Sequence, residues 1–183
     1  FKSDEVLVRT AGLWSSLLFD YFVRSTGRED FRNDLAKRMR MLDFQRLSES
    51  LLVRVLALNT LSQSYAELWS GCWNPNFRSQ NWSCERVAIN VDYFGELSEI
   101  WQRSNALRLD FERRQALLEI DVIVSMALRV TLSEIIGLYK MQFPVMRRYE
   151  DETFYDHNGR IIFTPSKGLI GVGLPRKARK TEL

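Results

Sequence analysis

Residues Leu107–Met126 read LRLDFERRQALLEIDVIVSM, and this stretch decides the fold class that we expect. Its apolar side chains recur at helical spacing on one predicted face: Leu107, Phe111, Leu118, Val122 and Met126. Arg, Glu and Asp stand opposite. Apolar residues three or four apart, with charges on the other side, are typical of an amphipathic helix. We therefore predict a helix from about Tyr93 to Arg129, the longest of the chain.

Helical periodicity also marks the chain before this stretch. We predict a first helix over Asp4–Arg24, which Gly27 would end, and a short basic helix over Arg28–Arg40. A longer helix is predicted from Leu47 to Trp69. From Gly71 to Asn90 no regular period fits, and Gly, Asn, Pro and Ser predict a loop.

Two local signals punctuate the C-terminal part. Thr131 and Glu134 fit a capping box, in which each side chain satisfies a backbone donor at the position of the other, and the helix that they begin should end near Pro144. Asn158-Gly159, between two apolar and aromatic runs, predicts a β-hairpin with a two-residue type I′ turn.

Together these elements predict a mainly α fold, a helical bundle-like body with a small C-terminal β-hairpin and a basic tail. We divide the chain into an N-terminal helical part (1–70), a loop (71–92), C-terminal helices (93–150) and the hairpin with the tail (151–183). They are expected to form one compact unit.

Composition excludes several classes of protein. The 183 residues hold 26 Lys and Arg and 23 Asp and Glu, a net charge of +3. Cys72, Cys84 and His157 are the only cysteines and the only histidine, too few for the usual four ligands of a structural zinc. No apolar run approaches the roughly 18 residues of a membrane span, and no secretory leader is recognisable. We therefore expect a cytoplasmic protein with reduced thiols, no metal and no membrane contact.

Three motifs could suggest catalysis. Asn74-Pro75-Asn76-Phe77 partly matches the Asn/Asp-Pro-Pro-aromatic loop of amino-group DNA methyltransferases, but its third residue is Asn and no glycine-rich cofactor loop is present. Lys167 with Gly168, Gly171 and Gly173 lacks the order of a phosphate-binding loop. His157 has no nucleophile beside it. For each of them we favour a structural turn, so we assign no catalytic residue and no cofactor to this chain.

Basic residues are the remaining candidates for a site. The segment Arg160–Leu183 has six basic residues and one acidic residue, a net charge of +5. Aromatic residues are interleaved among the basic groups of the C-terminal half, a pattern that suits a phosphate backbone. We predict DNA-backbone contacts from Arg113, Arg114, Arg147, Arg148, Arg160, Lys167, Arg176, Lys177, Arg179 and Lys180. The carboxylates Asp110, Glu112, Glu119 and Asp121 are interpreted as partners in ion pairs within their own helix.

Several segments resemble one family. The chain is similar, in scattered blocks over most of its length, to the C-terminal region of large adenine-specific DNA methyltransferases of bacterial restriction-modification and phage-defence systems. The blocks are Leu52–Leu61, Tyr65–Trp69, Arg108–Ala116, Glu119–Asp121, Gln142–Val145 and Tyr155–Thr164 with Lys167 and Gly168. Trp14–Arg24 resembles a helix of the target-recognition half, with Ser15-Ser16 where an Asn-Ser pair is common.

The resemblance implies a noncatalytic region of a larger enzyme. The methyltransferase domain, with S-adenosylmethionine and its Asn-Pro-Pro-aromatic motif, would lie upstream, and this chain would not methylate alone. Its expected partners are that upstream domain, double-stranded DNA and possible subunits of the defence system. Its expected work is to pack against the other domains and to help hold DNA while the adenine is turned out of the stack.

Two alternatives stay open. The apolar helical faces and the five tryptophans equally suit a helical protein-protein interaction module that docks a partner subunit without DNA contact. A freestanding enzyme ranks last, because no nucleophile, base and orienting group can be named.

Overall fold

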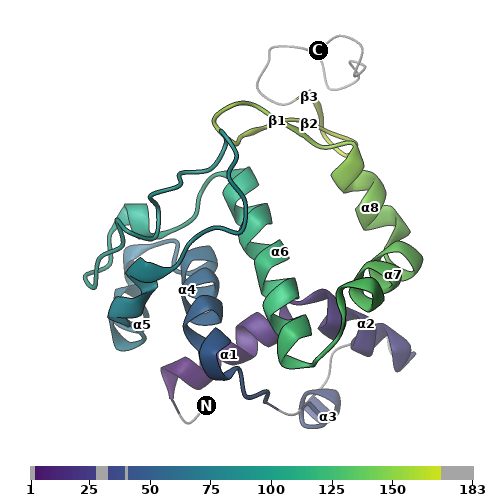
Figure 1. Cartoon of the computed structure of the whole chain (residues 1–183), viewed down its shortest axis with the longest axis horizontal. Helices are drawn as coiled ribbons and strands as arrows, with labels where there is room; N and C mark the ends of the chain where they lie inside the picture. The colour runs from purple at the N-terminus through teal and green to yellow at the C-terminus, as the bar shows by residue number, and fades with distance from the viewer. Residues whose placement is uncertain (1–2, 28–32, 40, 170–183) are drawn as a thin grey trace.

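The computed structural model describes residues 3–27, 33–39 and 41–169, and within them the chain is mainly helical (Figure 1). Eight α-helices lie in this part: α1 (Asp4–Trp14), α2 (Leu17–Ser25), α3 (Asn33–Ala36), α4 (Ser48–Asn59), α5 (Ala66–Gly71), α6 (Asp110–Ala127), α7 (Leu132–Gln142) and α8 (Pro144–Asp151). Three short strands follow: β1 (Phe154–Tyr155), β2 (Ile161–Thr164) and β3 (Gly168–Leu169). The predicted mainly α class with a C-terminal hairpin is confirmed. The predicted basic tail beyond Gly173 lies outside the described residues.

The hydrophobic core forms around α4. Every side chain from Leu51 to Leu58 is buried, because α1 and α6 both pack against this helix. Such all-round burial is typical of a central helix. Trp69 of α5 and Phe77 and Phe94 of the irregular segment after it are fully buried in the same cluster.

Two predicted helices are each broken in two. The helix predicted over Asp4–Arg24 bends by 69° between α1 and α2, because Ser16 caps α2 by accepting a hydrogen bond from the Phe19 amide through its hydroxyl. Its Oγ donates to the Leu13 carbonyl at 2.8 Å and so closes α1 as well. The helix predicted over Leu47–Trp69 ends at Asn59 and resumes as α5. Of the basic helix predicted over Arg28–Arg40, residues 33–39 are described, and only α3 is helical among them, so the helix ends earlier than predicted.

The longest helix is shorter than predicted, and its buried side differs. Residues 93–109 are irregular except for a 3-10 turn at Arg103–Asn105, so α6 begins only at Asp110. Three residues of the predicted apolar face are exposed: Leu118 (43%), Val122 (43%) and Met126 (56%). Glu112, Gln115, Glu119 and Asp121 are buried instead. The segment 71–92 covers Glu112, Gln115 and Glu119, and the start of α2 covers Asp121, which helical periodicity alone could not show.

The C-terminal hairpin is confirmed, but the predicted type I′ turn at Asn158-Gly159 is wrong. A type I′ turn needs positive φ at both Asn158 and Gly159, and only Gly159 has it (φ +78°). The Asp156 carbonyl accepts from the Gly159 amide at 3.0 Å, and the Asp156 carboxylate accepts from the amides of Asn158 and Arg160. The side chain of Asp156 thus centres the turn on His157 and Asn158, one residue earlier than predicted.

The hairpin closes onto the start of α6, as Figure 1 shows where β1 and β2 reach the upper end of that helix. The Phe111 amide donates to the Gly159 carbonyl at 3.0 Å, and Asp110 accepts from the Ile161 amide at 3.1 Å. The Phe111 and Tyr155 rings meet edge to face at 5.1 Å. β3 pairs antiparallel with β2 and completes a three-stranded sheet.

The predicted capping box is confirmed at the start of α7. Glu134 accepts from the Thr131 amide at 2.7 Å, and the Thr131 hydroxyl accepts from the Glu134 amide. α7 ends at Gln142, and Pro144 begins the additional helix α8 in the position where proline is tolerated.

Candidate functional site

A buried ion pair joins α4 to α6. The Nε atom of Arg54 lies 2.5 Å from Oε2 of Glu119, and both side chains are buried. Arg54 also donates to the carbonyls of Ser50 and Asn81, and its guanidinium lies over the Phe94 ring. A buried charge is tolerated only when it is paired and hydrogen-bonded in this way.

The other oxygen of Glu119 holds the irregular segment in place. It accepts from the amide and the hydroxyl of Ser83, each at 2.7 Å, and from Nε2 of Gln115 at 2.9 Å. Burial raises the pKa of the Glu119 carboxyl, but Arg54 and these hydrogen bonds outweigh it, so the pKa lies below its usual value. Both carboxylate oxygens of Glu119 are therefore bound within the fold.

Two further carboxylates of α6 are buried with less support. Glu112 accepts from the Asn90 amide at 3.2 Å, and Asp121 accepts from the Leu17 amide at 2.7 Å. Burial raises the pKa of Glu112, and it raises that of Asp121 to about 6 despite the Leu17 bond. Because Glu112, Glu119 and Asp121 reach other segments, and Asp110 reaches the hairpin, the predicted ion pairs within the helix are wrong for all four.

The ten residues predicted to contact DNA divide into three groups: those bound within the fold, those exposed, and those outside the described residues. Arg113 donates to the carbonyls of Leu58 and Leu107, and Arg114 pairs with Glu150 of α8, so both support the fold. Arg148 lies 3.2 Å from Glu152 in an exposed pair. The side chains of Arg147, Arg160 and Lys167 are exposed. Arg176, Lys177, Arg179 and Lys180 lie outside the described residues.

None of the three suspected motifs forms a reactive site among the described residues. Phe77 lies in a 3-10 helix (Pro75–Ser79) that Asn74 caps, and its ring is fully buried, so it cannot stack on a base. His157 is exposed in the hairpin turn. Gly168 has positive φ and pairs in β3, whereas Gly171 and Gly173 lie outside the described part.

Within the described ranges, no three His, Cys, Asp or Glu residues are grouped to hold a metal. Both cysteines are free, and burial raises the pKa of Cys72 to about 11.

An exposed apolar surface is the feature that sequence reasoning missed. We call Leu118, Val122 and Met126 the α6 stripe, since they follow one another four residues apart on the outside of α6. Leu132 (71% exposed) and Ile136 (41%) of α7 are further exposed apolar residues. Exposed apolar residues that share one helix face mark interaction sites more often than scattered ones do. The helical spacing correctly predicted that these residues share an apolar face. It did not predict that the rest of the described chain leaves this face exposed.

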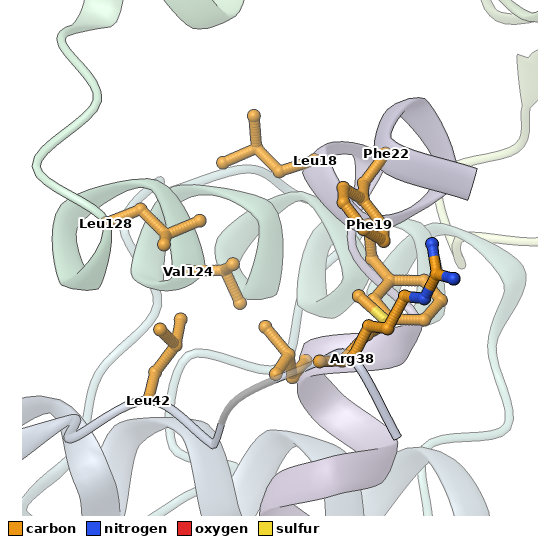
Figure 2. Close-up of a pocket in the computed structure, with 9 residues that line it drawn as sticks. Leu18, Phe19, Phe22, Arg38, Leu42, Val124 and Leu128 are labelled. Carbon is orange, nitrogen blue, oxygen red and sulfur yellow. The ribbon is translucent and has the colours of Figure 1, made fainter. Parts of the chain in front are cut away.

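A small pocket lies between α2, α6 and the segment that follows α3 (Figure 2). Its volume is about 310 Å³. Eight apolar side chains and one cation line it: Leu13, Leu18, Phe19, Phe22, Met39, Leu42, Val124, Leu128 and Arg38. Figure 2 shows Arg38 on the side of the pocket opposite Leu128, with Leu18 and Phe22 above and Leu42 below.

Within the described residues, no single helix has the length and apolarity of a membrane span, and the bent pair α1 and α2 meets that test only when taken together.

Compared with family models, with curated proteins and with solved structures, the chain matches none of them.

Proposed function

We propose that this chain is a noncatalytic helical region of a bacterial adenine-specific DNA methyltransferase of a restriction-modification or phage-defence system, and that its main work is to pack against the rest of that enzyme. The family rests on the resemblance of the segments given above. S-adenosylmethionine would bind in the upstream domain. The packing role rests on the geometry of α6.

One observation carries the packing role, namely the α6 stripe. Three large apolar side chains are exposed on α6. The other side of this helix is held by the Arg54–Glu119 pair and by the hydrophobic core. Residues spaced i, i+4 and i+8 form the kind of face that anchors helix-in-groove contacts. Covering it removes apolar surface from water, a favourable term of about 25 cal/mol per Å² that opposes the entropic cost of association.

The test is co-purification of the 183-residue chain with the protein segment encoded immediately upstream. Val122→Asp should abolish the complex, because it places a charge in the centre of the stripe. Val87→Asp is the matched control, since Val87 is 89% exposed and belongs to the irregular segment, not to α6. Equal recovery of both variants with the upstream segment would refute the packing role.

DNA-backbone contact is a second candidate, favoured by the exposed Arg147, Arg160 and Lys167 and by the charge of the C-terminal segment. We expect weak duplex binding by this chain, with affinity falling steeply as salt rises. Changing Arg176, Lys177, Arg179 and Lys180 to Ala should reduce the slope against salt by about one unit per lost phosphate contact. Arg113→Ala is the control: because Arg113 is bound within the fold, this change should lower stability without reducing the slope. Absence of duplex binding at low salt would refute DNA contact and would not affect the packing role.

A further inference from the structure

The pocket of Figure 2 has the chemistry of a ligand site that the packing role does not use. Eight of its nine lining side chains are apolar. They come from α1, from α2, from the C-terminal end of α6 with Leu128, and from Met39 and Leu42 after α3. Apart from the thioether of Met39, a weak acceptor, none of the eight side chains offers a hydrogen-bonding group. A pocket of about 310 Å³ is at the lower end of the range that small-molecule sites occupy. An occupant must therefore be small and present apolar surface to these walls.

Arg38 sets the charge of the occupant. It is the one charged side chain in the lining, it is exposed, and it forms no hydrogen bond or ion pair within the described part of the chain. The stretch Arg24–Arg46 that supplies it holds seven basic and four acidic residues, a net charge of +3. A cation at the edge of an apolar pocket favours an anionic group at the end of an apolar chain.

We propose that this pocket binds an amphipathic anion, an unbranched alkyl chain ending in one carboxylate. The chain lies between Leu42 and Val124 on one side and the side chains of α2 on the other. The carboxylate pairs with the guanidinium of Arg38 at the edge. The proposal is independent of the α6 stripe, because none of the three stripe residues lines the pocket.

Calorimetric titration of the 183-residue chain with hexanoate, octanoate and decanoate tests the apolar part. Each added methylene should strengthen binding roughly fourfold while it finds room in the pocket, since burial of a methylene is worth about 0.8 kcal/mol. Decyltrimethylammonium has a comparable chain and the opposite charge, and it should bind more weakly than decanoate. No binding by any carboxylate, affinity independent of chain length, or equal binding of the ammonium would overturn the proposal.

Two variants tie the binding to this pocket. Leu128→Trp should abolish decanoate binding, because the larger side chain fills the pocket. Leu128 is 43% exposed, so we expect the variant to fold, and circular dichroism checks this. Arg38→Gln should weaken decanoate binding about two- to fivefold, the worth of a solvent-exposed ion pair. Arg147→Gln is the control, since Arg147 is an exposed arginine outside the pocket lining. Equal affinities of Arg38→Gln and Arg147→Gln would show that the anion binds elsewhere, even if Leu128→Trp fails to fold.

Discussion

At the scale of single residues, Gly159 joins the hairpin to the helical body. Its φ of +78° is unfavourable for other residues, and a Cβ there would lie 2.9 Å from the carbonyl oxygen of Ala88. Its own carbonyl accepts the Phe111 amide at the start of α6. The conformation and the contact both require glycine.

Gly159→Ala should therefore lower the free energy of unfolding by about 1 to 3 kcal/mol, from left-handed backbone strain and from the close approach to Ala88. Urea denaturation measures it. Gly137→Ala is the matched control, because Gly137 lies within α7 with nothing near its missing Cβ, and it should raise stability by up to about 1 kcal/mol. Equal effects of the two substitutions would contradict the geometry of the turn.

Asp121 gives a prediction for pH. Burial raises its pKa from 3.8 to about 6, so between these values the folded state binds more protons than the unfolded state. The contribution of Asp121 to stability is therefore full below about pH 4 and declines as pH rises through 6.

Asp121→Asn should be more stable than wild type at pH 7 by about 1 to 3 kcal/mol, because Asn keeps an acceptor for the Leu17 amide without the buried charge. The difference should vanish near pH 4. Urea denaturation at the two pH values measures it. A constant difference at both would show that Asp121 does not titrate in this range.

At the scale of elements, features that depend on neighbouring residues were predicted correctly, whereas features that depend on tertiary packing were not. The capping box of Thr131 and Glu134 and the hairpin around Gly159 depend on neighbours in the chain, and both are present. The break at Ser16 was not predicted, because the apolar period continues across it and predicts one helix. The period of an apolar run gives its helical character, whereas breaks within it depend on packing around α4.

The site was predicted only in part, for the same reason. Arg147 and Arg160 are exposed, as the sequence predicted. Arg113 instead donates to backbone carbonyls, and Arg114 pairs with Glu150, contacts that the sequence did not predict. The buried Glu119 depends on Arg54, which is distant in sequence. No local pattern shows such a pairing, so the polar side of α6 was taken for its solvent side.

The two sides of α6 should respond differently to the same kind of substitution. Ile120→Ala removes a side chain that is 1% exposed and should lower the free energy of unfolding by about 2 to 5 kcal/mol. Leu118→Ala, in the stripe, should change it by no more than about 0.5 kcal/mol. Urea denaturation of the isolated chain measures both. A large loss from Leu118→Ala would mean that the stripe is already covered within this chain.

At the scale of the whole molecule, the described residues form a helical body whose buried polar groups are used for support. Arg54, Glu119 and Arg113 join segments that are distant in sequence, and the hairpin returns to α6. Within the described ranges, the exposed side chains include the apolar α6 stripe and the unpaired cations Arg147 and Arg160. This division between a rigid interior and an uncovered face supports packing as the primary role, with DNA contact second.

The most direct measurement of that role is the rate at which a thiol reagent labels Val122→Cys, with Cys84 changed to Ala and Cys72 left buried. The rate is compared between the 183-residue chain alone and its complex with the upstream segment, with Val87→Cys as the reference. The packing role predicts that the complex slows labelling at position 122 at least about tenfold and leaves position 87 unchanged. Equal labelling of position 122 in both states would contradict it.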